Sequence, residues 1–235
     1  AQLAAPTSSH AGALTTDQVV ALTSAQADSL SRNQLESLST EQVAAIETGD
    51  VAALKTTQVA ALKTTQVQAL TTEQVQALTS AGIAALNTNQ VGALTTDQVV
   101  ALTSAQAAAM TTAQIAAMET RDLATLTTSE IAALTTAQIN ALTSSQVGAL
   151  TTSQVKALAL DDVASMGTTQ LKGLSTTQIG AMNVTQLNAF TTTEVVAQST
   201  DQVKGLSKAQ ISGLSETNLK ALNTAQVAAL TTTQL

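Results

Sequence analysis

The chain has no cysteine, no tryptophan and no tyrosine, and it carries one proline (Pro6), one histidine (His10) and one phenylalanine (Phe190). The lack of cysteine excludes disulfides and thiolate metal sites. The hydrophobic 44% of the chain is therefore almost entirely Ala, Leu, Val and Ile, without the aromatic rings that usually fill a globular core. A core of small aliphatic side chains must be thin and uniform, which favours a narrow, repetitive structure.

Charge is also scarce, since charged residues make up 11% of the chain and the formal net charge is −7. The nine Lys and Arg residues are scattered, whereas a nucleic-acid binder needs a basic face to neutralise phosphates. Thr and Gln interrupt the apolar residues every few positions, so no apolar run is long enough to cross a membrane. We expect neither a nucleic-acid partner nor a membrane span.

An eight-residue repeat, Thr-Thr-x-Gln-Val-x-Ala-Leu, fills the chain, and we number its slots from Thr15. The eighth slot is Leu, Ile, Met or Phe at 27 of 28 positions, with Gln198 the exception, and the fifth is Val, Ile or Leu at 26 of 28. The fourth slot is Gln at 21 of 28 positions. No insertion or deletion shifts this phase. Because loops of ordinary domains tolerate insertions, such a register indicates that every residue belongs to a stacked lattice.

The spacing of Thr and Gln predicts one short helix in each octad. Thr-x-x-Gln is a capping box, in which the Thr hydroxyl accepts from the third helical N–H and the Gln reaches back to the N–H of the cap residue. With Thr15 as the N-cap, Gln18 is the third helical residue, and Leu14 and Val19 occupy the positions of a hydrophobic staple. The helix from Thr16 then runs only to about Leu22, before the next cap at Thr23, so each octad is one short helical turn plus a corner.

We therefore expect an all-α fold: a narrow solenoid, or superhelix, of short capped helices, one per octad. A single continuous helix is excluded, because its apolar stripe would rotate by about 80° per octad and face no partner. A β-solenoid with three octads per coil is the alternative, since an even period can preserve strand alternation. Residues 1–13, with Pro6 in the eighth slot and His10 in the fourth, are expected to form a degenerate first turn or cap. Residues 14–235 are expected to form a single continuous octad-repeat solenoid.

The other slots of the repeat predict further structural features. The seventh slot is always small (Ala, Ser, Gly or Thr), which predicts that neighbouring backbones approach there. The third and sixth slots are variable, which predicts that they face solvent. A few octads have a charged residue in the first slot, and there the following Thr is an alternative cap, which leaves the helix start open by one residue; these residues are Glu47, Lys55, Lys63 and Glu119.

The sequence contains no catalytic constellation. His10 is the only imidazole, and the many Ser and Thr hydroxyls occupy capping slots with no base beside them. Acidic residues near helix N-termini favour the helix dipole, so those that replace the fourth-slot Gln need no metal, and no Asp-rich loop has calcium-binding spacing. These replacements are Asp50, Asp122, Glu130, Asp162 (next to Asp161) and Glu194. We expect no catalytic, cofactor-binding or metal-binding residue, no cofactor and no enzyme activity.

Two functional alternatives remain for the Gln and Thr columns. If successive coils stack in register, the Gln side chains would form hydrogen-bonded ladders along the axis, and the Thr rows would order water or ice. Plain structural capping is the simpler interpretation, because capping already uses at least one hydroxyl of each octad.

The repeat sequence resembles two known kinds of protein segment. The segment LTTDQVVALTS, at Leu14–Ser24 and again at Leu94–Ser104, resembles the opening helix of TAL-effector DNA-binding repeats. That likeness covers about one octad, and the longer repeat, the base-reading dipeptide and the basic balance of that family are missing. The whole array is similar to the LTTxQ[VI]xAL octapeptide tracts of large secreted or surface adhesin-like proteins of Gram-negative bacteria, which are generally treated as stalks.

The resemblance and the register together predict a structural protein at the bacterial cell surface or outside the cell, either a filament subunit or an adhesin stalk. The chain ends at Leu235 in mid-octad without a polar cap, so we expect self-association, head-to-tail or lateral. The alternative is a protein- or glycan-binding repeat scaffold that uses the third and sixth slots along one face. Its only marks in the sequence are Phe190 and the disturbed octads around Gln198.

Overall fold

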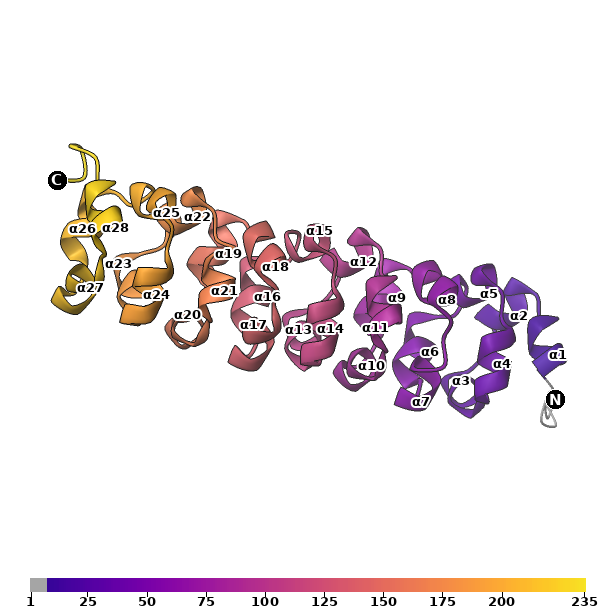
Figure 1. Ribbon diagram of the computed structural model, residues 1–235. Helices are drawn as coiled ribbons and strands as arrows, with labels where there is room; N and C mark the ends of the chain where they lie inside the picture. Colours follow the sequence, from indigo (N-terminus) through magenta and orange to yellow (C-terminus); the bar gives the residue numbers. More distant parts are fainter. Residues whose placement is uncertain (1–7) are drawn as a thin grey trace. The chain divides into compact units, whose positions relative to one another are not determined.

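A computed structural model describes residues 8–235, which contain 28 short helices and no strand (Figure 1). The all-α prediction is confirmed, and the β-solenoid alternative is wrong for this range. The chain divides into two compact units, residues 1–118 and residues 119–235, which we describe separately. Of the expected cap over residues 1–13, residues 1–7 lie outside the described range. The single continuous solenoid over residues 14–235 stays a prediction.

The helices of unit 1 are four to six residues long. They are α1 Ser8–Gly12, α2 Thr16–Val20, α3 Ser24–Ser29, α4 Arg32–Ser37, α5 Thr40–Ala44, α6 Thr48–Ala53, α7 Thr56–Val59, α8 Thr64–Ala69, α9 Thr72–Ala77, α10 Ser80–Ala85, α11 Thr88–Gly92, α12 Thr96–Val100, α13 Ser104–Ala109 and α14 Thr112–Ala117.

The helices of unit 2 have the same lengths. They are α15 Thr120–Leu123, α16 Thr128–Ala133, α17 Thr136–Ala141, α18 Ser144–Ala149, α19 Thr152–Ala157, α20 Leu160–Ser165, α21 Thr168–Leu171, α22 Thr176–Ala181, α23 Val184–Asn188, α24 Thr192–Ala197, α25 Thr200–Lys204, α26 Lys208–Gly213, α27 Glu216–Ala221 and α28 Thr224–Ala228.

Most corners between helices are made by two extended residues, the C-cap of one helix and the N-cap of the next. After α3, the C-cap Leu30 has φ −60° and ψ 130°, and the N-cap Ser31 has φ −71° and ψ 160°. No residue between 8 and 235 has a positive φ. The corners therefore need no left-handed glycine, which explains why so regular a series of turns contains so little Gly.

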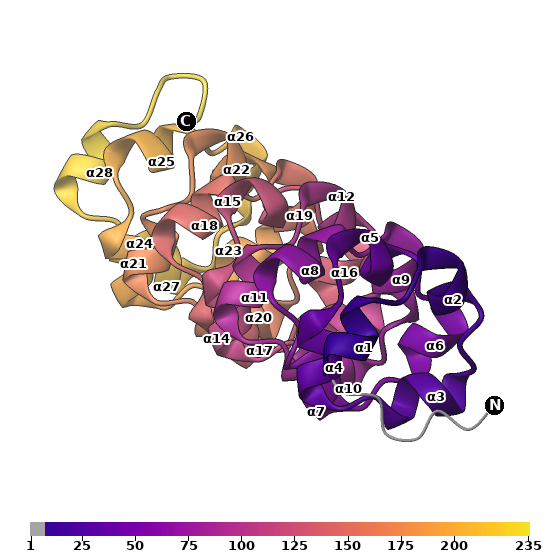
Figure 2. The same ribbon diagram turned by 90° about the vertical axis from the view of Figure 1, so that its right-hand side faces the viewer.

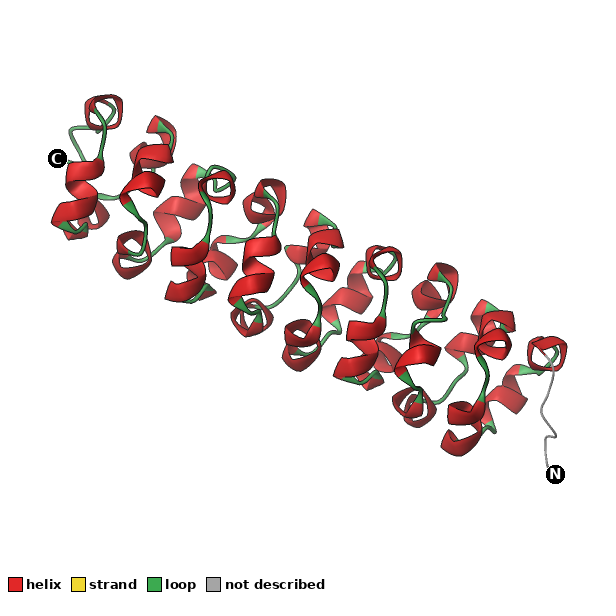
Figure 3. Cartoon of the chain, turned by 60° about the horizontal axis from the view of Figure 1, so that its bottom comes forward, coloured by secondary structure: helices red, strands yellow, loops and turns green. Residues whose placement is uncertain are grey.

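Within each unit, a helix packs against the helix three places further along the chain. In unit 1, α1 packs on α4 and α3 on α6; in unit 2, α16 packs on α19 and α24 on α27. Figure 2 shows α1 beside α4, and Figure 3 shows that only short loops join the helices. Three octads, or 24 residues, thus make one coil, and stacked coils form a solenoid in each unit.

The core of each unit is a line of fifth-slot and eighth-slot side chains. Val67 is fully buried and Leu70 is 5% exposed in unit 1, and Val155 and Leu158 repeat this pattern in unit 2. The third slot is exposed in every octad from residue 17 to residue 233, and most of the sixth slot is exposed. The predicted directions of these slots are confirmed.

The seventh slot lies where two coils meet closely. A Cβ added at Gly173 would lie 2.2 Å from the carbonyl oxygen of Ser144, and one at Gly205 would lie 2.6 Å from that of Thr176. Real Cβ atoms do not approach other atoms so closely, so the backbones touch at these two glycines. The prediction that small seventh-slot residues mark close backbone approach is confirmed there.

Candidate functional site

The candidate site is not a cleft but the column of fourth-slot residues, which we call the inward column. Its glutamines begin each helix with the predicted capping box. At α9, the backbone N–H of Thr71 donates to Gln74 Oε1 at 2.8 Å, and the N–H of Gln74 donates to Thr71 Oγ1 at 3.2 Å. The same reciprocal pair recurs in most octads, for example between Thr151 and Gln154 in unit 2. The capping prediction is confirmed.

The amide nitrogen of an inward glutamine connects its coil to the preceding coil. Gln66 Nε2 donates to the carbonyl oxygens of Leu35 at 2.7 Å and Leu38 at 2.9 Å. In unit 2, Gln154 Nε2 donates to the carbonyl oxygens of Leu123 at 2.8 Å and Leu126 at 2.7 Å. The offsets are 31 and 28 residues each time. The carbonyls of Leu38 and Leu126 accept no backbone hydrogen bond at the end of their own helices, so these glutamines cap both the start of their own helix and the end of a helix in the preceding coil.

The alternative in which the glutamines form ladders with one another does not hold. Where both partners are described within one unit, the amide of an inward glutamine donates to main-chain carbonyls of the preceding coil. Gln66 and Gln90 are 1% exposed, and Gln74 and Gln154 are 2% exposed. Buried polar groups are costly unless they are hydrogen-bonded, and here both ends of the amide are satisfied. The inward column therefore fastens the coils together.

Charged residues in the first slot do not shift the helix start. Lys55 and Lys63 keep the N-cap position, and so do Glu47 and Glu119, so the alternative start at the following Thr is not used. At Lys55, the backbone N–H still donates to Gln58 Oε1 at 2.7 Å. The phase is therefore fixed by the buried fourth-slot residue, which is an aspartate after Glu47 and after Glu119, and not by the exposed cap side chain.

Acidic residues in the inward column are buried as well, although they cannot donate as an ionised group. Glu194, 7% exposed, keeps the capping half of the motif, since its Oε2 accepts from the N–H of Thr191 at 2.6 Å. The shorter Asp50 and Asp162 instead accept from a hydroxyl in the preceding coil. Asp161, next to Asp162 in the sequence, is exposed. The two adjacent carboxylates therefore do not work as a pair.

Two other inward residues lack part of the amide function. Gly82 is buried and has no side chain, so no amide reaches the carbonyl of Leu54. Asn218 is one methylene shorter than Gln, and its Nδ2 reaches only the carbonyl of Leu187, at 3.2 Å. Loss of the donor is thus tolerated at a few places in each unit.

The residues that the sequence singled out for binding lie in different settings. Phe190 is 4% exposed and Gln198 is 8% exposed, so both fill eighth-slot core positions instead of marking a docking surface. His10 is exposed at the start of unit 1. Within residues 8–235, no three His, Cys, Asp or Glu residues lie close enough together to hold a metal ion. None of the helices described there is long and apolar enough to span a membrane.

Two glutamates at exposed third-slot positions have perturbed ionisation. The backbone N–H of Glu41 lowers the pKa of that residue's own carboxyl below its ordinary value, and the Ser39 hydroxyl adds to the effect. At Glu73 the backbone N–H again has the largest effect, followed by the hydroxyls of Thr71 and Thr72, and the pKa is lowered in the same way. Free N–H groups at a helix start favour a carboxylate.

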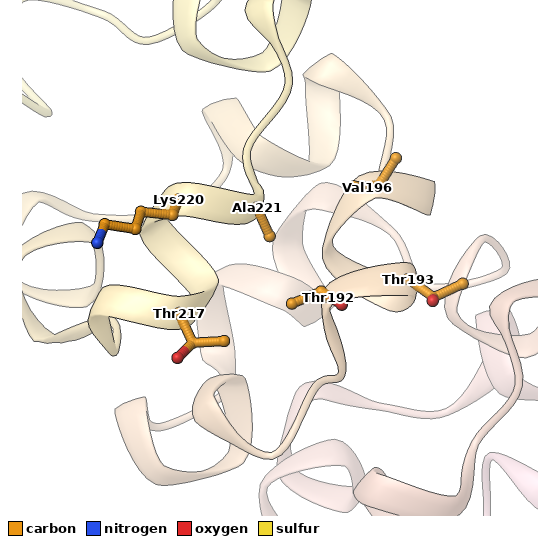
Figure 4. Close-up of a pocket in the computed structure, with 6 residues that line it drawn as sticks. All are labelled: Thr192, Thr193, Val196, Thr217, Lys220 and Ala221. Carbon is orange, nitrogen blue, oxygen red and sulfur yellow. The ribbon is translucent and has the colours of Figure 1, made fainter.

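One shallow hollow lies on the outer surface of unit 2, between α24 and α27. Its lining residues, shown in Figure 4, are Thr192, Thr193, Val196, Thr217, Lys220 and Ala221. Val196 is 49% exposed, like the other sixth-slot valines, Val20 at 44% and Val100 at 52%. The hollow is open to solvent.

One comparison with known proteins, a protein-family model, agrees with the repeat. The ALTTAQ repeat family matches this chain over residues 43–80, 75–104, 83–120, 115–152 and 155–192, which together are more than half of its length. No curated protein matches the sequence. Among solved structures, the leucine-rich repeat-containing protein LegL7 from Legionella pneumophila matches with a TM-score of 0.25 and 13% identity, over 85% of this chain and 68% of that one. A likeness of that size carries no argument about fold or function.

Proposed function

The chain belongs to the ALTTAQ repeat family, and on that premise we propose that it is a structural protein of the bacterial exterior. It acts as an extended segment that holds other parts at a distance, either as the stalk of an adhesin or as the subunit of a filament. Its coarser role, that of a repeat-built scaffold, already follows from the tandem helices and the family.

The observation that carries this proposal is the double use of the inward glutamines. In each unit, a buried amide connects successive coils at regular offsets of 28 and 31 residues. Repeat proteins of this kind gain stability from contacts between neighbouring repeats. A lattice fastened by backbone-directed hydrogen bonds resists both bending and slippage of the coils. Stiffness is what a stalk or a filament requires.

Electron microscopy of the purified chain over a range of concentrations tests the proposal. Elongated particles that lengthen as concentration rises are expected for a filament subunit, because head-to-tail contacts build open polymers. Elongated particles of one length at every concentration support the stalk and contradict the filament. Compact, rounded particles contradict both.

The hollow between α24 and α27 favours one second candidate, a protein- or glycan-binding scaffold. An exposed apolar residue beside hydroxyls and a lysine is a surface on which a sugar ring packs. A glycan array probed with the chain and with Val196→Lys tests this idea. Binding that the substitution abolishes supports it, whereas an array without signal, or a signal that the variant retains, contradicts a site at this hollow.

A further inference from the structure

Two rows of stacked helices, one in each unit, carry outward side chains of opposite charge. In unit 1, α3, α6, α9 and α12 pack on one another in that order, and α15, α18, α21, α24 and α27 do so in unit 2. The third and sixth slots are the outward positions of each octad. We call the third-slot and sixth-slot residues of the first set the acidic row and those of the second set the basic row.

All the charged residues within each row have the same sign. The acidic row contains Asp28, Glu73 and Asp97. The basic row contains Arg121, Lys172 and Lys220. The other two rows of unit 2 each include an aspartate at these slots, Asp161 or Asp201. The outward slots of one face of unit 1 thus carry only negative charge, and those of one face of unit 2 carry only positive charge.

The two rows also share one order of side chains. The first helix of each row carries a charge in these slots, the second carries none, the third carries a charge and the fourth carries an exposed valine. The valines are Val100 on α12, which is 52% exposed, and Val196 on α24, which is 49% exposed. Both rows advance by one coil per helix. If the acidic row is placed along the basic row with α3 on α15, Glu73 therefore comes opposite Lys172, and Val100 comes opposite Val196.

The central charges of this match have no counter-charge in their own chain. Neither Glu73 nor Lys172 forms an ion pair with any residue between 8 and 235. The outer charges differ, since Asp28, Arg121 and Lys220 each have an oppositely charged partner in their own unit. An exposed charge without a partner gains more from a new opposite charge than one that is already paired. The electrostatic match therefore rests mainly on Glu73 and Lys172.

We propose that the acidic row of one copy docks on the basic row of a second copy of this chain. The inference rests on the filament version of the proposed function and gives it a side-by-side contact. Each copy has one row of each kind, so the same contact can be repeated from copy to copy. Complementary charges select and align the partner, and Val100 of the second copy packs into the shallow hollow that Val196 lines. Exposed ion pairs are weak individually, so the contact is sensitive to salt.

Sedimentation velocity of the full chain over a range of concentrations tests the contact. Association is expected at roughly 10 mM salt and is expected to weaken about tenfold at roughly 150 mM salt, because the screening length falls from about 30 Å to about 8 Å. Glu73→Lys and Lys172→Glu each place like charges opposite one another. Each variant is expected to associate about tenfold more weakly than the parent, or less.

A mixture of the two variants supplies the sharpest test. In the mixture, Glu73→Lys of one chain comes opposite Lys172→Glu of the other, so equal amounts are expected to regain the association of the parent. The matched control reverses the same charges outside the two rows. Glu41→Lys and Lys156→Glu change exposed third-slot and sixth-slot residues of other helices, and each is expected to associate as the parent does.

The outcomes separate this contact from the proposed function. Association that the two reversals leave unchanged, or that the control reversals weaken equally, overturns the contact, and so does a mixture that associates as weakly as its components. Filaments that persist in both variants under the electron microscope overturn the contact alone and keep the filament. Particles of one length for the parent at every concentration contradict both the contact and the filament.

Discussion

Glu73 and Gln74 are neighbours in the sequence and start the same helix, α9, yet they belong to different regions of the molecule. Glu73 stands on the outer surface, where its carboxylate is solvated and is held by the free N–H groups of the helix start. Gln74 is 2% exposed and donates to the carbonyls of Val43 at 3.0 Å and Ile46 at 2.6 Å in the preceding coil. Glu73 therefore lies on the surface, whereas Gln74 connects two coils.

The difference between these two positions lies in what surrounds them. On the outer surface, water can replace any hydrogen bond that a substitution removes, so the net loss is small. In the inward column the groups are buried, so a lost donor leaves the eighth-slot carbonyl of the preceding coil unsatisfied, while the fifth-slot carbonyl still accepts from the backbone N–H three residues later. Substitutions of the same type at inward and outward positions should therefore differ in size.

The largest expected effect is the loss of one inward glutamine. Gln66→Ala removes the acceptor for the Lys63 N–H and the donor to Leu35 and Leu38. We expect a loss of about 2–4 kcal/mol in the free energy of unfolding, from buried groups left without partners. Urea denaturation followed by circular dichroism measures it.

The same helix offers the matched control. Gln68→Ala makes the same change in α8, but Gln68 is exposed in the sixth slot. Its loss is expected to stay within about 0.5 kcal/mol. Equal losses in the two variants would mean that the amide contacts of Gln66 do not stabilise the fold.

A smaller effect of opposite sign is expected where the column lacks a side chain. Gly82→Gln supplies an amide that can reach the unsatisfied carbonyl of Leu54, and the new Cβ would lie 3.3 Å from Thr79 Oγ1, the cap that pairs with Gln in other octads. We expect a gain of about 1–2 kcal/mol from the amide and from the helix preference of Gln over Gly.

The outward control for this variant is Gly49→Gln, in the third slot of α6, where an added Cβ meets nothing within 4 Å. It is expected to gain only the helix preference, about 0.5–1 kcal/mol. The difference between the two thermal midpoints isolates the amide contacts. No difference would show that the added amide remains unbonded.

Changing one atom at Glu194 is expected to have a still smaller effect. Glu194→Gln keeps the acceptor for the Thr191 N–H and turns the other carboxylate oxygen into a donor for the preceding coil. We expect a gain of about 1 kcal/mol. Thermal unfolding at neutral pH measures it, with Glu41→Gln as the charge-matched outward variant. A loss of stability at Glu194 would show that the carboxylate has a partner of its own there.

Much of the fold was predictable from the sequence because its signals are local. The capping box, the phase of the fifth and eighth slots and the small seventh slot each follow from residues a few positions apart. The 24-residue coil was not predictable, because it depends on how the corners turn. Those corners are built from extended Leu and Ser or Thr residues with no distinctive turn sequence.

The second contact of the inward glutamines was missed, although the sequence contained a signal for it. A capping box accepts Glu as well as Gln at its third helical position, yet the fourth slot has 21 Gln, and its only Glu residues are Glu130 and Glu194. A preference for the amide indicates that a donor is needed as well as an acceptor. The identity of the acceptors, 28 and 31 residues earlier, required the structure.

The smallest expected effect concerns the outward carboxylates alone. Because folding lowers the pKa of Glu41 and Glu73, their contribution to stability is fully present above the unfolded pKa of a glutamate, about 4.3, and is lost as the pH falls through the folded value. The double variant Glu41→Gln with Glu73→Gln should be slightly less stable than the parent at pH 7 and equal to it in strong acid. Urea midpoints measured along an acid titration check this convergence. A difference in urea midpoint that stays constant with pH would mean that the helix starts, and not the carboxylate charges, cause it. In that case the inward column would be the only position where one side chain controls how the coils hold together.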